Sequence, residues 1–463
     1  MNFPAAFISN IIHTFGKAEG EQLLHAMQDK PTVSVRLNPC KHKNKDRNMT
    51  AHLPFADSVP WCEDGYYLHQ RPSFTDDPLF HLGHYYVQEA SSMFLHTVLR
   101  QFVHQPVHML DLCAAPGGKS TLARTVLPEG SILVSNDPMR KRANILLENI
   151  QKWGHPDNIV TCDYPATFAT FGETFEVILC DAPCSGEGMF RKEEAAIAQW
   201  TEALVNECAV KQRDILTEAW KCLKPGGILI YSTCTLNTRE NENNVAWMAE
   251  QFNADILPVD IQPEWHIVSS PVSGFPFPVY RFLPHRTKGE GLFMAVARKG
   301  EFCSDTHKQK KGKNTTATAS LSSEQRTVIQ SWLNDSSNFR LTSSGNDVLA
   351  IPRHYFSLYE QLTRRHHVLG AGVMAATLKG KALLPHQALA LSTACNTQAF
   401  ATCEMNDEQA LSFLRTETLQ LSNDIPTGIV LLLYKGVPLG FVKNIGNRAN
   451  NLYPSEWRIR KLT

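Results

Sequence analysis

The chain has no excess charge of either sign and no long hydrophobic segment. Its 463 residues include 45 basic and 45 acidic side chains, so the formal net charge is zero. A balanced charge gives no overall attraction to a polyanion, and any nucleic-acid surface must consist of local basic patches. No apolar run reaches the roughly 18 residues that a membrane-spanning helix needs. Residues 1–20 lack the basic and apolar regions of a signal peptide, so we expect a cytoplasmic protein.

Paired cysteine motifs are also missing. The 12 cysteines are scattered singly, and no two of them have the C-x-x-C spacing of a zinc site. Most are expected to be small buried apolar residues in a reducing compartment, where disulfides are rare. The sequence therefore predicts no metal site and no structural disulfide.

The composition, with 43% hydrophobic and 19% charged residues, is that of a globular protein. The length suggests about three domains. The strongest boundary signal is a polar, Lys- and Thr/Ser-rich stretch, EFCSDTHKQKKGKNTTATASLS, at residues 301–322. We predict an N-terminal RNA-binding subdomain, an α/β domain, a linker, a small α+β unit and a last unit at residues 1–95, 96–300, 301–322, 323–378 and 379–463.

Short apolar strands alternate with helices from residue 107 onward. Such alternation predicts a parallel, doubly wound α/β sheet. Residues 293–297 are expected to add a final edge strand. The five strands of the alternating region are expected at residues 107–112, 132–136, 159–162, 177–180 and 227–232.

A small-residue turn, DLCAAPGGKS from Asp111 to Ser120, follows the first of these strands. Such a turn at a helix N-terminus lets a ligand approach the backbone closely. Asp137 ends the second strand, where a carboxylate can accept hydrogen bonds from ribose hydroxyls, and Asp163 ends the third, where it can hold an adenine amino group. The turn is not G-x-G-x-x-G and leaves no room for a pyrophosphate, which favours S-adenosylmethionine over a dinucleotide.

Two cysteines follow neighbouring strands. Asp181 and Cys184 lie in ILCDAPCSGEGMFR, and Cys234 lies in YSTCT. Because the carboxyl ends of parallel strands meet at one edge, both thiols are expected to face the same crevice. A thiolate beside S-adenosylmethionine suits methylation of a carbon that is not nucleophilic, such as cytosine C5, after attack on C6. Asp181 could hydrogen-bond the N3/N4 edge of the base. These residues alone leave Cys184 and Cys234 tied as the nucleophile.

Amine methyltransferases carry Asn/Asp-Pro-Pro-Tyr at the position where this chain has Asp-Ala-Pro-Cys, and the difference favours carbon over nitrogen. The runs DLCAAPGGKS, SNDPMRKRANIL, ILCDAPCSGEGMFRK and LIYSTCTLNTRENE resemble the motifs of the Nol/Nop/Sun RNA cytosine-C5 methyltransferases. The resemblance implies a Rossmann-like methyltransferase core. The C-terminal run LLLYKGVPLGFVKNIGNRANNLYPSEWRIR is similar to the PUA-like RNA-binding domain of bacterial 16S ribosomal RNA methyltransferases.

The resemblance also implies residue roles. Cys234 is the nucleophile, Cys184 releases the product, and Asp137 stands where many relatives carry Glu. The residues implied to bind S-adenosylmethionine are Cys113, Ala114, Ala115, Pro116, Gly117, Gly118, Lys119, Asp137, Asp163 and Asp181.

RNA contacts are expected where loop cations lie beside aromatic side chains. We expect a monomer that methylates cytosine C5 in the decoding region of 16S ribosomal RNA through a covalent Cys234–C6 adduct, with ribosomal RNA or the small ribosomal subunit as partner. A transfer RNA substrate and a non-catalytic RNA-binding ribosome assembly factor are the alternatives. The basic clusters are Arg140–Arg142, Arg281–Lys288, Lys308–Lys313, Arg364–His367 and Arg458–Lys461, and the chosen RNA-contact residues are Arg36, Lys443, Arg448 and Trp457.

Overall fold

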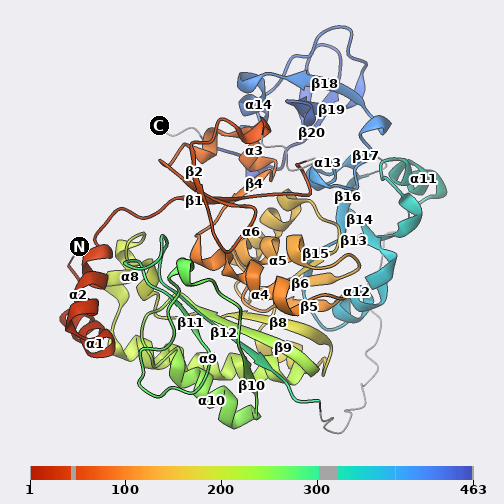
Figure 1. Ribbon diagram of the computed structural model, residues 1–463. Coiled ribbons are helices and arrows are strands. Elements are labelled where there is room, and N and C mark those ends of the chain that lie inside the picture. Colours follow the sequence, from red (N-terminus) through yellow and green to blue (C-terminus); the bar gives the residue numbers. More distant parts are fainter. Residues whose placement is uncertain (1, 43–47, 302–320, 381, 461–463) are drawn as a thin grey trace.

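The computed structural model describes residues 2–42, 48–301, 321–380 and 382–460. Its centre is a nine-stranded sheet with the strand order β10-β12-β9-β8-β5-β6-β7-β15, and β11 pairs with β12 (Figure 1). The five central strands pair in parallel, which confirms the predicted doubly wound α/β core. These strands are β5 (His108–Asp111), β6 (Ile132–Asn136), β7 (Asn158–Thr161), β8 (Phe175–Asp181) and β9 (Leu223–Thr233).

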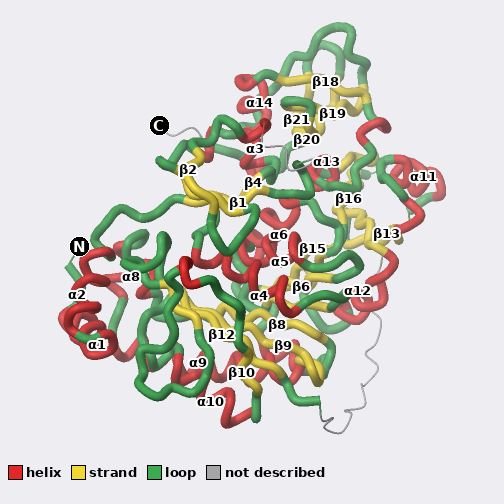
Figure 2. The backbone as a smooth tube through the Cα atoms, viewed as in Figure 1, coloured by secondary structure: helices red, strands yellow, loops and turns green. Residues whose placement is uncertain are grey.

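Helices cover both faces of this sheet because alternate strand residues point in opposite directions. Leu110 and Ile178 pack into a cluster with α9 and α10, whereas Met109 and Val177 pack with α4 and α5. Figure 2 shows these two pairs of helices on opposite sides of the strands. The helices of the core are α4 (Leu95–Phe102), α5 (Gly118–Val126), α6 (Arg140–Trp153), α9 (Glu202–Cys222) and α10 (Glu242–Phe252).

Both ends of the sheet differ from the sequence prediction. β12 (Leu292–Arg298) pairs with β9 as expected, but it is not the edge, because β10 (Asp255–Leu257) and β11 (Tyr280–Phe282) both pair with it. Strands of three residues are too short to give a periodic signal. At the other end, β15 (Val368–Ala371) pairs antiparallel with β7. The region beyond residue 320 therefore contributes to the central sheet.

The N-terminal region contains two helices and a small sheet of order β2-β3-β1-β4. The helices α1 (Ala5–Phe15) and α2 (Lys17–Ala26) pack against Phe190 and Trp200 beside α8 (Glu194–Gln199). The strands are β1 (Ser34–Leu37), β2 (Phe55–Ser58), β3 (Gly65–Leu68) and β4 (Tyr85–Val87).

The C-terminal region holds two further four-stranded sheets, β13-β14-β16-β17 and β18-β19-β20-β21. The last sheet contains a hairpin, and its turn residues Lys435 and Gly436 have φ of 50° and 75°, as a tight hairpin turn requires. The strands are β13 (Phe339–Ser344), β14 (Asp347–Pro352), β16 (Val373–Lys379), β17 (Ala382–Pro385), β18 (Ala401–Met405), β19 (Gly428–Tyr434), β20 (Val437–Asn444) and β21 (Ala449–Asn451).

The first and last parts of the chain share one hydrophobic core. Leu37 and Tyr85 of the N-terminal sheet pack in the same cluster as Val430 and Trp457. In Figure 1 the N-terminal sheet lies between the central sheet and the C-terminal hairpin. No helix in the described parts of the chain has the length and apolarity needed to cross a membrane. The exact domain boundaries stay a prediction, and the basic cluster Lys308–Lys313 lies outside the described residues.

Candidate active site

The turn between β5 and α5 has the shape of a ligand cradle. Gly117 has a φ of +114°, which side-chain-bearing residues rarely adopt, and α5 begins at the next residue. A Cβ at Gly118 would lie 3.3 Å from the Tyr86 ring. The first N–H groups of α5 lack partners within the helix, so this turn can accept a polar ligand at close range.

Buried carboxylates surround the turn. Asp111 is fully buried and its Oδ2 accepts a 2.6 Å hydrogen bond from the Ser120 hydroxyl. Asp137 is also buried; its Oδ1 accepts from the Met139 amide, and its Oδ2 accepts no hydrogen bond among the described residues, although the Arg142 guanidinium lies 3.4 Å away. A buried carboxylate oxygen with unused acceptor capacity fits a ribose hydroxyl. These residues therefore fit the nucleoside of S-adenosylmethionine.

Asp163 follows β7 at the same edge of the sheet, and both of its oxygens already have partners. Its carboxylate accepts hydrogen bonds from the imidazoles of His366 and His367 and from the backbone amide of His367. Both histidines lie beyond residue 320, in the segment that leads into β15. No local sequence pattern places this segment beside Asp163.

Asp181 ends β8 and links β9 to the turn between β5 and α5, which is called the cofactor turn below. Its Oδ2 lies 2.8 Å from the Lys119 ammonium, and its Oδ1 accepts a 2.6 Å hydrogen bond from the Ser232 hydroxyl. Burial by itself would lower the pKa of Lys119, but the charges of Asp181, Cys234 and Asp111 raise that pKa above its usual value. Lys119 is therefore a cation of the turn that interacts with both Asp181 and Cys234.

The two cysteines predicted to share one crevice lie side by side. Because Asp181 pairs with Ser232 in the β8–β9 register, the loops that follow the two strands start together. The Cys184 and Cys234 sulfur atoms are 3.2 Å apart, and both residues are half-buried. The hydrogen bond with Cys234, together with burial, raises the pKa of Cys184 well above its usual range. Cys184 is thus held as a thiol whose S–H can point at the Cys234 sulfur.

A buried glutamate joins the two cysteine loops. Glu240 is fully buried and accepts hydrogen bonds from the Ser185 amide at 3.0 Å, the Ser185 hydroxyl, Gln212 Nε2 at 2.7 Å and Asn237 Nδ2 at 2.8 Å. Burial raises the pKa of Glu240 in spite of these donors. Since Ser185 directly follows Cys184 and Glu240 follows the Cys234 loop, one carboxylate fixes the spacing of the two loops.

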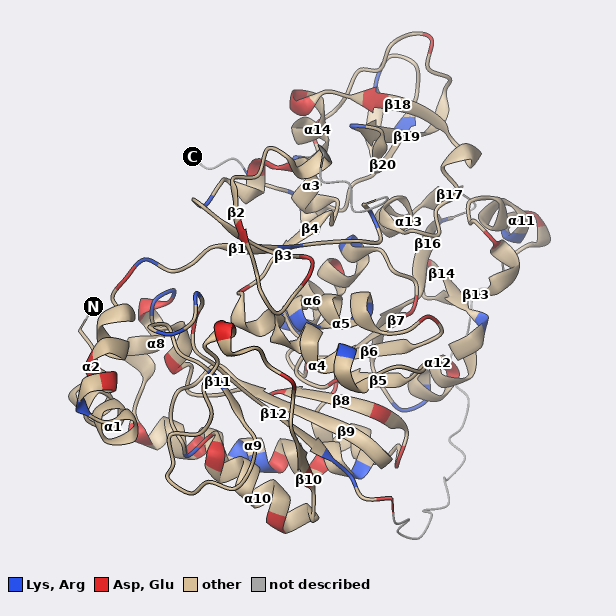
Figure 3. Cartoon of the chain, viewed as in Figure 1, with Lys and Arg blue, Asp and Glu red and all other residues tan. Residues whose placement is uncertain are grey.

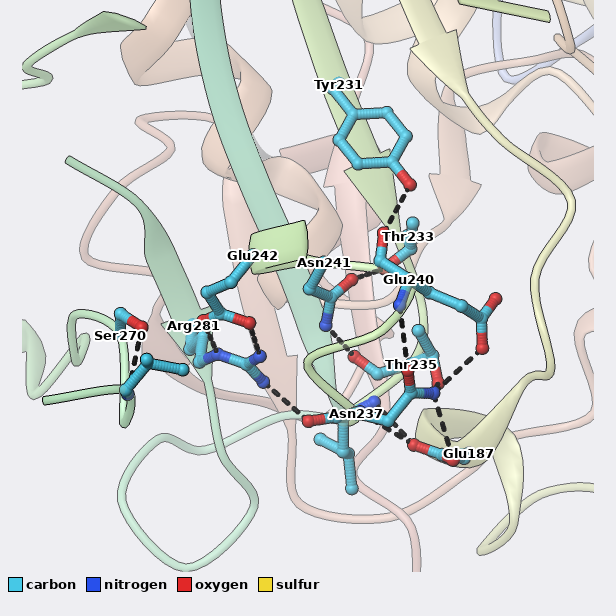
Figure 4. A network of polar contacts seen from close by, with 12 residues as sticks. Glu187, Tyr231, Thr233, Thr235, Asn237, Glu240, Asn241, Glu242, Ser270 and Arg281 are labelled. Atoms are coloured by element: carbon cyan, nitrogen blue, oxygen red, sulfur yellow. Dashed lines mark hydrogen bonds and ion pairs between the residues drawn. The ribbon is translucent and has the colours of Figure 1, made fainter. Parts of the chain in front are cut away.

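A second carboxylate makes a parallel connection. Glu187, from the Cys184 loop, accepts hydrogen bonds from the backbone amides of Leu236 and Asn237 at 2.8 and 2.9 Å and from the Trp200 indole at 2.9 Å. Figure 4 shows the Asn237 side-chain amide between the carboxylates of Glu187 and Glu240. Two carboxylates, Glu187 and Glu240, therefore tie the two cysteine loops together. In the sequence, Glu240 belongs to the acidic run RENE after the second cysteine. This run does not indicate that one of its carboxylates connects the two cysteine loops.

Two of the expected RNA contacts are wrong in this structure. Arg36 is 1% exposed, donates to Gln88 and Thr121, and its guanidinium lies 4.4 Å from the Trp153 ring centre. Trp457 is 8% exposed and packs in the core shared by the two ends of the chain. Each is buried because it joins the N-terminal sheet to another part of the molecule, so neither can touch RNA.

Two of the basic clusters contain internal residues as well. Arg281 is 1% exposed and forms an ion pair with buried Glu242, and buried His366 binds Asp163. The other members Arg286, Lys288, Arg364 and His367 are exposed, as are Lys443 on β20 and Arg448 after it. The C-terminal RNA-contact prediction therefore rests on Lys443 and Arg448.

A Rossmann-like sheet with a glycine turn, three carboxylates at strand ends and a lysine–aspartate pair beside two thiols defines an S-adenosylmethionine-dependent methyltransferase. Three family models match this chain. They are described as 16S rRNA methyltransferase RsmB/F, the N-terminal domain of 16S rRNA methyltransferase RsmF, and the methyltransferase RsmF PUA domain, and they match residues 99–298, 3–90 and 400–459.

Full-length relatives agree with these matches. The chain is 30% identical to the ribosomal RNA small subunit methyltransferases F of Aliivibrio fischeri strain ES114 and Salmonella paratyphi A, over 98% of this chain and 97% and 96% of theirs. A solved methyltransferase homolog from Pyrococcus horikoshii is 27% identical with a TM-score of 0.56, over 64% of this chain and 96% of that one. The chain belongs to the ribosomal RNA small subunit methyltransferase F family, and its C-terminal sheet is a PUA domain.

Proposed function

We propose that this enzyme methylates C5 of a cytosine in the decoding region of 16S ribosomal RNA, with Cys234 as the nucleophile. The observation that carries the proposal is the pair of sulfur atoms 3.2 Å apart, beside the Lys119–Asp181 ion pair and the cofactor turn. Methylation of a carbon that lacks nucleophilic character needs a covalent activator, and a thiolate is the strongest nucleophile among these side chains.

The chemistry follows from what each side chain can do. The target cytosine leaves its stack to reach the site. The Cys234 thiolate forms a bond to C6, and the electron pair displaced to C5 makes that carbon nucleophilic. Bound S-adenosylmethionine supplies the electrophilic methyl group. A base then removes the C5 proton, the C5–C6 double bond re-forms, and Cys234 leaves as a thiolate.

Cys184 and Asp181 have distinct parts in this scheme. The S–H group of Cys184 faces the Cys234 sulfur and stabilises the departing thiolate by a hydrogen bond, which suits a role in product release. Asp181, held by Lys119 and Ser232, accepts a hydrogen bond from the cytosine amino group while charge develops on the ring. The Lys119 cation stabilises negative charge on Cys234.

Local basic surfaces support an RNA substrate. In Figure 3 basic and acidic segments alternate along α9, so affinity for a polyanion has to come from separate clusters. A groove of about 880 Å³ runs between the N-terminal sheet and the segment after Cys184, and its charged lining consists of the cations Lys30, Arg71, Arg191 and Lys192 and the carboxylates Glu89 and Glu193. We propose that the RNA strand lies in this groove and that Lys443 and Arg448 bind a second part of the RNA.

The two ends of the groove support its connection to the chemistry. Gln88, a groove residue, lies beside the cofactor turn, 3.7 Å from where a Cβ of Gly118 would be. Met189, another groove residue, directly follows Gly188, whose amide donates a 2.8 Å hydrogen bond to the Cys234 carbonyl. A strand bound in the groove would therefore pass close to both the cofactor turn and the nucleophile.

The test is transfer of a labelled methyl group from S-adenosylmethionine to unmodified 16S ribosomal RNA and to assembled small subunits, with the modified base mapped by bisulfite sequencing. The proposal predicts one 5-methylcytidine in the decoding region with the wild-type protein and none with Cys234→Ala. Transfer only to transfer RNA would replace the ribosomal substrate. Binding without transfer to either RNA would favour an assembly factor. The monomeric state and the cytoplasmic location stay predictions.

A further inference from the structure

His366 and His367, at the end of the segment Arg364–His367, both contact the Asp163 carboxylate, and the His367 side chain is 79% exposed. The His366 side chain is fully buried, with its ring centre 4.4 Å from that of Phe168 and 5.1 Å from that of Phe171. The backbone is fixed too, because the Cys162 amide donates a 2.9 Å hydrogen bond to the His367 carbonyl. Packing and a backbone hydrogen bond therefore hold this segment in a defined position beside Asp163.

The protonation of His366 follows from its surroundings. Burial lowers the pKa of His366, although the neighbouring Asp163 opposes this shift, so the ring is neutral at pH 7. His366 Nδ1 lies 3.1 Å from Asp163 Oδ2, and only an N–H at that nitrogen can bond to a carboxylate. The single ring proton therefore sits on Nδ1 and holds the carboxylate.

The two oxygens of Asp163 differ in the number of donors that the described residues provide. Oδ2 receives two hydrogen bonds, from His366 Nδ1 and from the His367 amide at 2.9 Å. Oδ1 receives one from the described residues, from His367 Nδ1 at 2.8 Å. A carboxylate oxygen accepts two hydrogen bonds, so Oδ2 is saturated by these donors and Oδ1 has one position left.

We propose that His366 and His367 are positioning residues that set the adenine specificity of the cofactor site. They fix the Asp163 carboxylate so that the remaining acceptor position of Oδ1 receives the adenine amino group. This inference rests on the proposed role of Asp163 in adenine binding. It makes the region beyond residue 320 part of cofactor recognition, in addition to its place in the central sheet.

The specificity has a simple physical origin. A fixed carboxylate accepts from an amino group but repels a carbonyl oxygen at the same position, as in hypoxanthine. A carboxylate free to rotate can turn away from that oxygen, and the discrimination is lost. The histidines should therefore affect the preference between the two bases more than the affinity for either one.

The experiment measures Kd values for S-adenosylhomocysteine and S-inosylhomocysteine by calorimetry on the full chain. The two ligands differ at the purine position that bears the amino group. We expect the wild type to prefer the adenosyl compound by roughly 100-fold or more, because a site that hydrogen-bonds a donor rejects ligands without it. His366→Phe keeps an aromatic ring between Phe168 and Phe171 and removes the donor, and should lower this preference about tenfold. His367→Ala should lower it as well.

The choice of readout and two control variants make the result decisive. The ratio of two Kd values on one preparation is insensitive to a partly unfolded fraction, so poor folding of a variant does not imitate the effect. His104→Phe, at an exposed histidine before β5, is the matched control and should keep the wild-type ratio. Asp163→Asn should abolish the preference.

Each failure points to a different claim. If Asp163→Asn keeps the wild-type ratio, the role of Asp163 in adenine binding is wrong and the inference falls with it. If Asp163→Asn abolishes the preference while His366→Phe and His367→Ala retain it, only the role of the histidines is overturned. Neither outcome depends on methyl transfer or on RNA.

Discussion

The sulfur atoms of Cys184 and Cys234 lie 3.2 Å apart, within hydrogen-bonding distance. The hydrogen bond between them and burial raise the pKa of Cys184. A thiol in its protonated form is a poor nucleophile and can donate to a neighbouring thiolate. Either sulfur can be the donor in this contact, so the proposal that Cys234 forms the bond and Cys184 assists release rests on the family motifs together with the proximity of the two thiols.

Glu240→Gln should loosen the two cysteine loops. All four groups bonded to this carboxylate are donors, so a glutamine NH₂ would face at least one of them. We expect a loss of about 1–3 kcal/mol in the free energy of unfolding, typical of a buried group left without its partner. Under conditions where the variant is fully folded, the rate of adduct formation at saturating RNA should fall, with the affinity for S-adenosylmethionine unchanged.

The control for this variant is Glu250→Gln, an exposed glutamate on α10. It should change neither stability nor rate. A Glu240→Gln enzyme that forms the adduct at the wild-type rate would mean that the carboxylate stabilises the fold without positioning the thiols.

Asp111 should make stability depend on pH. Burial raises its pKa to about 7, although the Ser120 hydrogen bond opposes the shift. Because this folded-state pKa is above the unfolded value of about 3.9, the folded protein binds more protons between these two values and loses stability as pH rises through that range. Asp111→Asn removes the titrating group and should therefore unfold with less pH dependence.

Urea denaturation at pH 5 and pH 8 measures this effect. The stability of Asp111→Asn relative to wild type should increase between the two pH values by an amount on the order of 1–3 kcal/mol. Asp214→Asn, at an exposed position on α9, should show no such change. A stability difference that is the same at both pH values would show that Asp111 does not titrate in this range.

Trp457→Ala should lower the free energy of unfolding, because the indole is a buried core residue and not a residue that stacks on RNA. The indole packs between the two ends of the chain, and removing a buried aromatic side chain costs about 3–5 kcal/mol. Lys443→Ala and Arg448→Ala, at exposed positions, should leave the unfolding free energy within about 0.5 kcal/mol of wild type and weaken RNA binding. Thermal unfolding and filter binding distinguish the two patterns, and the reverse pattern would contradict the burial of Trp457.

The groove between the N-terminal sheet and the Cys184 loop should contribute to RNA affinity through charge. A triple variant Lys30→Ala/Arg71→Ala/Lys192→Ala should weaken RNA binding and reduce the slope of log K against log salt by about 2, as loss of three phosphate contacts on a single strand implies. Arg191 is left in place because it pairs with buried Glu290.

The matched control for the groove is Lys211→Ala/Lys379→Ala, two exposed lysines outside it. This double variant should keep the wild-type salt dependence. A triple variant with an unchanged slope would remove the groove from the path of the RNA, and the C-terminal cations would then have to account for binding.

The sequence predicts the central fold well because local signals and tertiary structure agree there. Helix α6 follows local signals, since its apolar stripe is regular and Gly154, with a φ of 84°, ends it. The two cysteines and Asp181 come together because parallel strands bring their carboxyl ends to one edge.

Long-range contacts explain what the sequence does not predict. Arg36 and Trp457 have the residue types of RNA contacts, but their burial depends on surfaces far away in the chain. The histidines of RRHH look like a basic cluster, and only the pairing of β15 with β7 brings them to Asp163. No local pattern carries such information, since it depends on how separate elements pack.

Trapping the covalent intermediate shows whether Cys234 forms the bond to RNA and Cys184 assists its release. Cys184→Ala protein, incubated with unmodified 16S ribosomal RNA and S-adenosylmethionine, is run on a denaturing gel and the cross-linked peptide is identified by mass spectrometry. We expect a stable protein–RNA adduct on Cys234, and none in Cys184→Ala/Cys234→Ala. An adduct that persists in the double variant, or Cys234→Ala protein that methylates RNA at the wild-type rate, would contradict this assignment of the two cysteines.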